Sequence, residues 1–472
     1  MGNAPAHKVA DAAISENRPT SITDVVDEWP TWTETLETML FQAGYNTNVV
    51  IIGTTLLGLA AGIIGVFALL RKRSLMSDAL SHATLPGIGL AFLIAPLIGL
   101  DGRSLPVLLF GATVTGVIGV LCIQALLRVT RLREDAAIGI ILSVFFGAGV
   151  VTLTYIQANA QGNVAGLNRF IYGQTAAMRA GDAVLMGGIA LTAVCALLLL
   201  LKEFSLVCFN DTFARVDGWP VLLIDLLMMG LVVVVTVAGL QAVGLILVVA
   251  MLIIPAVSAR FWTERLWLLV VLAGVIGASS GYLGSIMSAL FPRKPAGAVI
   301  VLTAGAMFTF SMIAAPARGV IAVAIRRLRL RLQIAGEHIL EAGYEAAADA
   351  DGTSVLSRDG AIGVAGRRGW PAWFLRFVVF LLHRQGMVKT HDNGVALTAL
   401  GRARGARVHR NHRLWEQYLI SYADIAPSHV DWSVDQVEHV LSDELIDELE
   451  VALAEQGILI PGEPGLEGPI AS

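Results

Sequence analysis

Long apolar segments alternate with short polar ones through the middle of this chain. Nine segments between positions 47 and 315 each have about the length, roughly 17 to 25 residues, that crosses a hydrocarbon core of about 30 Å. Pro86 interrupts the second of them. The segments are residues 47–70, 75–100, 105–127, 136–156, 183–201, 220–238, 242–259, 266–290 and 295–315. The pattern predicts an all-α polytopic membrane bundle of about nine transmembrane helices.

Charge divides the chain into three zones and so predicts its domains. Hydrophobic residues make up 56% of the chain and the mean hydropathy is +0.71, which is outside the usual range of soluble proteins. Residues 316–472, by contrast, hold 16 basic and 20 acidic side chains. We expect an extracytoplasmic segment over 1–46, a transmembrane domain over 47–320 and a soluble domain over 321–472.

Arginine and lysine gather in alternate loops, which predicts the orientation. Such residues are retained on the cytoplasmic side of a membrane. The richer loops hold Arg71, Lys72, Arg73, Arg128, Arg131, Arg133, Lys202, Arg215, Arg260, Arg265, Arg318, Arg326, Arg327, Arg329 and Arg331, and the others hold Arg103, Arg169, Arg179, Arg293 and Lys294. We expect the N-terminus outside and the C-terminal domain in the cytoplasm. A bundle of buried soluble helices would not give this alternation.

The segment before the first span has the spacing of an amphipathic helix. Between positions 20 and 45, Trp29, Trp32, Leu36 and Met39 stand among acidic residues. We expect this helix to lie on the outer surface of the membrane. A short ordered segment that only leads into the first span would give the same pattern.

Two further features of the composition exclude common functions. The net charge of −4 provides no broad basic surface for nucleic acid. Cys122, Cys195 and Cys208 lie far apart in apolar surroundings, so we expect them to pack rather than to bind metal or form disulfides.

Asp78 and His82 stand four residues apart inside the second apolar segment, a spacing that puts both side chains on one helix face. A rise of about 1.5 Å per residue places His82 about 13 Å into the membrane. A charged residue at the bilayer centre costs about 2.5–3.5 kcal/mol on insertion scales, so we expect the pair to face the bundle interior. One carboxylate and one imidazole suit Mn, Fe or Zn. The alternative is a structural Asp–His hydrogen bond at a helix kink.

The residues around this pair resemble a known family. The segment 75–89 reads LMSDALSHATLPGIG and is similar to the hallmark of the zinc, manganese and iron permease family of ABC importers. The resemblance continues over residues 41–320, through 133–139 (REDAAIG), 170–173 (FIYG), 209–218 (FNDTFARVDG), 243–248 (VGLILV), 252–259 (LIIPAVSA) and 295–297 (PAG).

The resemblance implies a transport complex in the bacterial plasma membrane. Its expected parts are a second permease subunit, identical or different, cytoplasmic ATPase subunits, and an extracytoplasmic metal-binding protein. No Walker A pattern occurs in this sequence, so we expect a partner to hydrolyse ATP and this chain to be a transport subunit rather than an enzyme. Metal is expected as substrate and as a regulatory ligand, without a tightly bound cofactor. The residues alone do not choose among Mn, Fe and Zn.

The segment 209–218 resembles the short helix that docks into the ATPase in this family. The resemblance assigns ATPase coupling to Phe209, Asp211, Ala214 and Gly218. Position 210 is Asn where the family has Asp. An ordinary polar turn is the alternative.

Seven of the nine histidines lie beyond residue 330, and carboxylates stand near them at helical spacing. Any one such group is also typical of a solvated helix face. The stretches 397–401 (LTALG), 408–419 (VHRNHRLWEQYL) and 434–443 (VDQVEHVLSD) resemble iron- and manganese-dependent repressors, which have a winged helix followed by a helical metal-binding domain. The resemblance assigns metal ligands to His338, Glu341, His412, Asp435, Glu438 and His439, with Glu416 and Asp431 near a second site.

The segment in the place of a DNA-recognition helix, residues 367–377, is rich in bulky apolar side chains such as Trp370, Trp373 and Phe374. Polar side chains read base edges, so we do not expect DNA binding. Contact with membrane lipid is expected from the basic stretch 326–331. The alternative functions are a membrane-tethered, metal-responsive transcription regulator and a proton- or sodium-coupled carrier.

Overall fold

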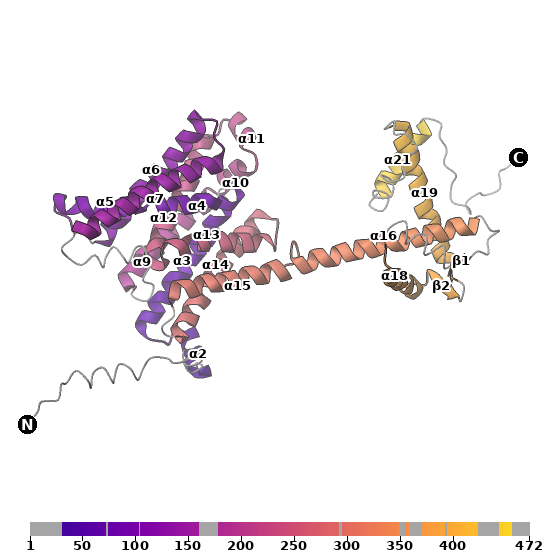
Figure 1. Ribbon diagram of the computed structural model, residues 1–472, viewed down its shortest axis with the longest axis horizontal. Helices are drawn as coiled ribbons and strands as arrows, with labels where there is room; N and C mark the ends of the chain where they lie inside the picture. The colour runs from indigo at the N-terminus through magenta and orange to yellow at the C-terminus, as the bar shows by residue number, and fades with distance from the viewer. Residues whose placement is uncertain are drawn as a thin grey trace, which may run out of the picture. The chain divides into compact units, whose positions relative to one another are not determined.

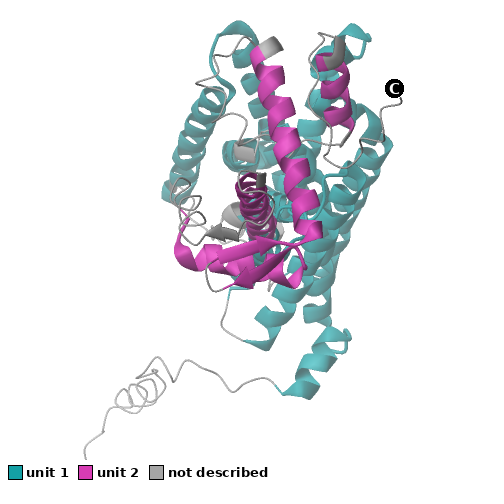
Figure 2. Ribbon diagram, turned by 90° about the vertical axis from the view of Figure 1, so that its right-hand side faces the viewer, with its two compact units in different colours: residues 1–322 teal, residues 323–472 magenta. Residues whose placement is uncertain are grey.

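The computed structural model describes residues 31–71, 74–102, 104–159, 178–291, 295–348, 355–357, 370–391, 394–422 and 443–455. The chain forms two compact units, Met1–Ala322 and Val323–Ser472, which Figure 2 colours separately. Each unit has its own hydrophobic core.

The first unit is a helical bundle, shown in Figure 1. Its long helices are α3 (Tyr45–Leu70), α6 (Leu105–Val129), α7 (Glu134–Asn159), α9 (Ala180–Leu199), α12 (Val221–Val243), α14 (Leu266–Leu290) and α15 (Ala296–Ala314). Shorter helices are α2 (Trp32–Met39), α4 (Ser74–Ala83), α5 (Leu85–Ile94), η2 (Ala95–Ile98), α10 (Leu201–Phe209), α11 (Asp211–Val216) and α13 (Leu245–Arg260). The predicted all-α polytopic bundle is confirmed.

In the described part of the chain, eight helical stretches are long and apolar enough to cross a membrane. One of them is the α4–α5 pair, which the sequence expected as a single interrupted span. The predicted span 242–259 instead forms the 16-residue helix α13, about 24 Å long at 1.5 Å per residue. Gly244 separates α13 from α12 with φ 89°, a backbone conformation that favours glycine.

Helices α3 and α14 pack closely because glycines face one another. A Cβ atom at Gly58 would fall on the carbonyl group of Gly277, and one at Gly281 would fall on that of Thr54. The Thr54 hydroxyl also lies 2.7 Å from the Ser285 hydroxyl across this interface. Small residues and hydrogen bonds hold helices together where lipid removes the hydrophobic driving force.

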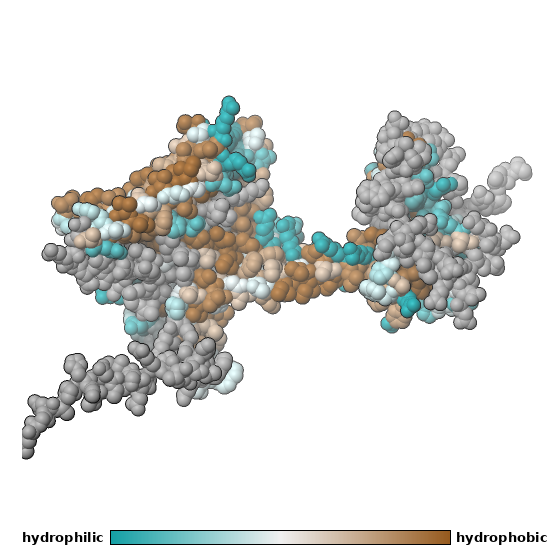
Figure 3. Space-filling model, viewed as in Figure 1, coloured by the Kyte–Doolittle hydropathy of each residue, from teal (hydrophilic) through white to brown (hydrophobic). Residues whose placement is uncertain are grey.

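The outer surface of the bundle is apolar. Figure 3 shows hydrophobic residues spread over α5 and α6, and the exposed large side chains on α6, α7 and α9 include Phe110, Val151 and Leu191. Such a surface is unfavourable in water and suits the acyl chains of a bilayer.

The N-terminal helix α2 covers part of the predicted amphipathic segment, and the residues of that segment before Thr31 lie outside the described ones. Thr31 caps α2 by a reciprocal pair of hydrogen bonds with Glu34. Trp32 and Leu36 are exposed, and the Tyr282 hydroxyl of α14 donates to the Met39 carbonyl at 2.7 Å. The helix is thus attached to the bundle and presents apolar side chains outward.

The second unit combines helices with a small antiparallel sheet. Its elements are α16 (Val320–Ala348, which begins in the first unit), β1 (Val355–Ser357), α18 (Ala372–Arg384), β2 (Val388–His391), β3 (Gly394–Leu397), α19 (Ala399–Tyr422) and α21 (Asp443–Glu455). The strand order is β1-β3-β2. Leu340, Phe374 and Val388 bring α16, α18 and the hairpin into one core. A helix followed by a hairpin agrees with the predicted winged-helix-like architecture.

The α3–α14 contact gives a first prediction. Gly58→Ala should lower stability by about 1–3 kcal/mol, because the added methyl group forces two backbones apart. Thermal unfolding of the purified protein in detergent measures the effect. Gly188→Ala on α9 is the matched control, since a Cβ there meets nothing within 4 Å. Equal melting temperatures for the two variants would contradict the packing described.

Candidate functional site

The helix that carries Asp78 and His82 is interrupted two residues beyond His82. Helix α4 ends at Ala83 and α5 begins at Leu85, with Thr84 between them. Pro86 has no N–H to donate to the carbonyl four residues before it, which is that of His82. The Thr84 hydroxyl donates to the Ser81 carbonyl at 2.6 Å and so satisfies one backbone group at the break. The sequence predicted this interruption from Pro86.

Asp78 and His82 lie on the same face of α4, as their spacing predicted. The Nε2 atom of His82 is 3.6 Å from the Oδ1 atom of Asp78, which is longer than a hydrogen bond. A cation with bonds of about 2.0–2.2 Å to both atoms fits such a separation. The side chains are 21% and 42% exposed, so both remain reachable. The closed hydrogen bond of the structural alternative is not formed in this geometry.

The rest of the His82 ring is held in place by the bundle. Phe146 of α7 lies edge-on to the imidazole, with ring centroids 4.9 Å apart and an interplanar angle of 83°. The Nδ1 atom is buried and has no hydrogen-bond partner among the described residues. A buried polar atom without a partner is costly, and such atoms often mark functional positions. The imidazole therefore has unused capacity to bind a proton or a metal ion.

The predicted ATPase-docking segment, residues 209–218, starts at the last residue of α10 and contains α11. The Asn210 side chain accepts a hydrogen bond from the Phe213 N–H at 2.9 Å and thereby caps α11. Asn and Asp are about equally good N-caps, so the residue that departs from the family still begins this helix. Phe209 is exposed, and Gly218 ends the segment with φ 84°. Ala214 is buried against the bundle, so it packs the helix rather than facing outward.

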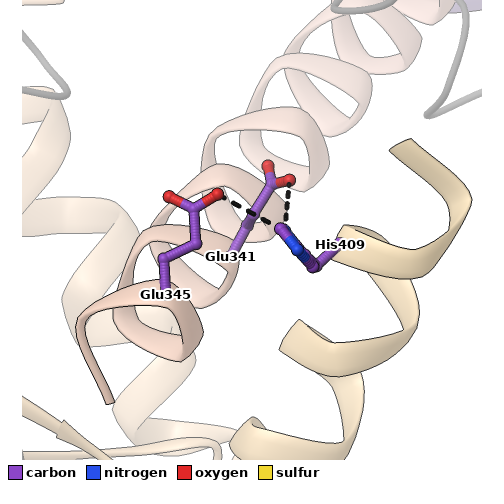
Figure 4. Close-up of side chains that lie close together, drawn as sticks. All are labelled: Glu341, Glu345 and His409. Atoms are coloured by element: carbon purple, nitrogen blue, oxygen red, sulfur yellow. Dashed lines mark ion pairs between the residues drawn. The ribbon is translucent and has the colours of Figure 1, made fainter. Parts of the chain in front are cut away.

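A second group of metal-ligand side chains surrounds Glu341 in the C-terminal unit. The Nδ1 atom of His338 lies 3.6 Å from one Glu341 oxygen, and those of His409 and His412 lie 3.7 and 3.9 Å from the other. His409 is also 3.3 Å from Glu345. Figure 4 shows Glu341 and Glu345 on one helix, both directed toward His409 on another. Oxygen and imidazole nitrogen ligands of this kind suit divalent transition metals.

Glu341 is a buried carboxylate in a basic surrounding. Burial alone would raise its pKa, but the neighbouring imidazoles of His338, His412 and His409 outweigh burial, and the net effect lowers the pKa. Glu341 is therefore ionised near neutral pH. An ionised carboxylate among imidazoles is prepared to bind a cation.

The structure thus joins three of the predicted regulatory ligands, His338, Glu341 and His412, and adds two that sequence reasoning missed. The signal for Glu345 and His409 was present: residues 341 and 345 are four apart, and 409 and 412 are three apart, so each pair shares a helix face. Asp431, Asp435, Glu438 and His439 lie outside the described residues. Glu416 lies 3.9 Å from Arg413.

Residues 367–377 stand in the place of a DNA-recognition helix, and the structure describes them from Trp370 onward. Trp370 contacts Phe374 edge-on at 6.1 Å and lies 6.1 Å from the His338 ring. Phe374 belongs to the core of the unit. These side chains hold α16 and α18 together, which leaves them unsuited to reading base edges.

Comparisons with known proteins agree with this geometry. The ABC 3 transport family matches residues 45–315, and the iron dependent repressor metal binding and dimerisation domain matches residues 398–455. The manganese transport system membrane protein MntC of Bacillus subtilis is 39% identical over 382 residues, which is 81% of this chain and 86% of that protein. The zinc transport system membrane protein TroC of Treponema pallidum is 42% identical over 61% of this chain and 95% of its own length.

A solved structure is also similar. PsaBC from Streptococcus pneumoniae in complex with Fab is 30% identical, has a TM-score of 0.53, and covers 61% of this chain and 98% of its own. The 61% of this chain that is covered is close to the fraction that the helical bundle occupies.

Proposed function

The chain belongs to the ABC 3 transport family, and we propose that it is the permease through which an ABC importer moves divalent manganese or zinc across the bacterial plasma membrane. Its relatives MntC and TroC are membrane proteins of manganese and zinc transport systems, which supports these substrates. Iron is also compatible with these ligands, since oxygen and imidazole donors bind manganese, zinc and iron.

The observation that carries the proposal is the Asp78–His82 pair. The two side chains share one face of α4 and lie 3.6 Å apart, and His82 stands two residues before the interruption at Thr84. Broken helices at membrane depth are tolerated where they line a cavity or are buried in protein, and substrate sites occur at such breaks. We infer that the transported ion binds between the carboxylate and the imidazole.

In the proposed cycle an extracytoplasmic binding protein delivers the ion to this pair, and partner ATPases drive its release inward. The exposed apolar side chains of Phe209 and Phe213 give α10 and α11 a surface that suits docking to an ATPase. The arginine and lysine distribution supports an outer N-terminus and a cytoplasmic C-terminal unit. A second permease subunit would complete the path.

The two other functions considered are less well supported. A transcription regulator needs a polar recognition surface, whereas Trp370 and Phe374 pack into the C-terminal unit. A proton- or sodium-coupled carrier would need no ATPase, and the family match favours an ABC transporter.

We further propose that cytosolic metal regulates transport through the C-terminal unit. The cluster of Glu341, Glu345 and His409 brings three ligand atoms within 4.8 Å of one another, and His338 and His412 border the same carboxylate. We infer that metal binds there when internal metal is plentiful and inhibits further import.

Replacing the membrane ligands tests the permease. Asp78→Asn and His82→Ala should each reduce manganese uptake to the level of cells without the permease, because the ion loses a ligand in the path. Uptake of radioactive manganese measures this at equal amounts of protein in the membrane. Thr154→Val on α7 is the control, since that hydroxyl is exposed and bonds only to the Val150 carbonyl of its own helix. Full uptake by both ligand variants would refute the assignment.

Regulation is tested separately. Glu341→Gln and His409→Ala should raise the internal manganese that half-inhibits uptake by at least about tenfold, since changes even outside the first ligand sphere cost 10- to 100-fold in metal affinity. Uptake into vesicles preloaded with graded manganese provides the measurement. His391→Ala is the matched control, because that histidine is exposed on β2 and is not one of the residues of the cluster. If the two variants are inhibited at the wild-type concentration, the cluster does not regulate transport.

A further inference from the structure

Arg71 and Asp225 form a buried ion pair inside the first unit. A terminal nitrogen of Arg71 lies 3.1 Å from Oδ1 of Asp225, and Nε of Arg71 donates to the same oxygen at 3.1 Å. The side chains are 16% and 5% exposed. Gln124 donates to the other Asp225 oxygen at 2.8 Å. The carboxylate is therefore bound on both of its oxygens.

This pair joins four helices. Arg71 is the C-cap residue of α3, Asp225 lies in the second turn of α12, and Gln124 lies on α6. The Arg71 guanidinium also donates to the carbonyl of Val207 on α10, at 3.2 Å. One guanidinium thus holds the end of α3, the start of α12 and the last turns of α10 together.

The Arg71–Asp225 pair lies close in the chain to the helix that carries the proposed metal ligands and contacts the helix before the docking segment. Helix α4, with Asp78 and His82, begins three residues after Arg71. Val207 is two residues before the end of α10, and the docking helix α11 follows immediately. A displacement of α10 would therefore act on the Arg71 side chain, and Arg71 precedes the start of α4 by three residues of the chain.

Stability alone does not account for such a pair. Removing two charges from water costs several kcal/mol per ion, and replacing a buried ion pair by well-packed apolar residues is often neutral or stabilising. Geometric specificity is what the pair adds, because two nitrogens of the planar Arg71 guanidinium bind one Asp225 oxygen while the third donates to Val207, which fixes the direction of the group as well as its distance. A rigid junction of this kind is suited to carry movement between helices.

We propose that the Arg71–Asp225 pair transmits movement of the ATPase-docking segment α10–α11 to helix α4, and so couples ATP hydrolysis to release of the metal from Asp78 and His82. The inference rests on the proposed permease function and deepens it. Arg71 and Asp225 act here as positioning residues, since neither touches the metal pair in the described contacts.

The test uses the whole transporter, with its ATPase and binding protein, in proteoliposomes. Manganese uptake and ATP hydrolysis are measured together for Arg71→Gln and Asp225→Asn. We expect the manganese transported per ATP to fall roughly tenfold, within the 5- to 150-fold range typical of coupling between sites. ATP hydrolysis and the affinity of the detergent-solubilised permease for manganese should stay within about twofold of wild type, because the metal ligands and the docking surface are untouched.

The single variants leave one charge buried without its partner and can fail to fold, so the double variant Arg71→Gln/Asp225→Asn is made as well. It leaves no unpaired charge, and its two amides can still bond, yet it lacks the ion pair. We expect it to assemble and to remain uncoupled. Wild-type manganese per ATP in this variant would overturn the proposal, as would an equal loss of ATP hydrolysis and uptake.

Arg318→Gln and Glu264→Gln serve as controls. This ion pair has a 2.7 Å contact, but its side chains are 49% and 70% exposed, and exposed pairs contribute little. Both controls should keep the wild-type ratio. A wild-type transporter without ATP-driven manganese uptake would contradict the permease function itself, whereas normal uptake with an unchanged ratio in the Arg71 and Asp225 variants contradicts only the coupling role.

Discussion

Within an apolar bundle every buried polar atom needs a partner, because lipid offers none and an unpaired group costs several kcal/mol. Most of the buried polar side chains described here obey this rule. Thr54 bonds within its own helix and to Ser285 of α14, and Asp225 binds Arg71 and Gln124. His82 is the exception that bears on function, since its Nδ1 atom is buried without a partner among the described residues and its Nε2 stands 3.6 Å from Asp78. Buried oxygens of Glu203 and Thr236 also lack a partner among the described residues, so what distinguishes His82 is that its unpaired nitrogen lies in the proposed metal site.

Helix α3 takes part in several of these contacts. Along its length it packs closely on α14 through Gly58 and Gly277, and at its end Arg71 joins it to α12 and α10. Close backbone approach makes an interface difficult to slide, because carbonyl groups and Cα atoms interlock. Helix α4 begins at Ser74, three residues after this anchored end of α3. Thr84 keeps helical dihedrals where α4 gives way to α5, and Ile88 donates to its carbonyl, so the proposed metal pair lies on one span that Pro86 interrupts.

The sequence predicted the bundle because twenty-residue apolar runs have few other stable structures, and it predicted the Asp78–His82 geometry because helical spacing alone fixes it. Contacts between residues that are distant in the sequence were harder to predict. Asp225 is the one acidic residue in its apolar segment, a signal of function or pairing, yet nothing in the sequence names Arg71 as the partner. Glu345 and His409 were missed for a similar reason, because their meeting depends on how α16 and α19 pack. The shortness of α13 follows from Gly244, whose effect on the backbone the apolar pattern does not reveal.

The metal pair has a consequence for electroneutrality. Asp78 contributes one negative charge and a neutral imidazole contributes none, so a divalent cation bound there would retain an excess charge of about +1. An uncompensated charge in a low-dielectric medium carries a large Born energy, which a second nearby anion removes. A two-fold arrangement of permease subunits, each bringing its own carboxylate to a shared axis, would cancel the ionic charge completely. The composition of this short helical face thus gives an electrostatic reason to expect a second carboxylate near the proposed ion site.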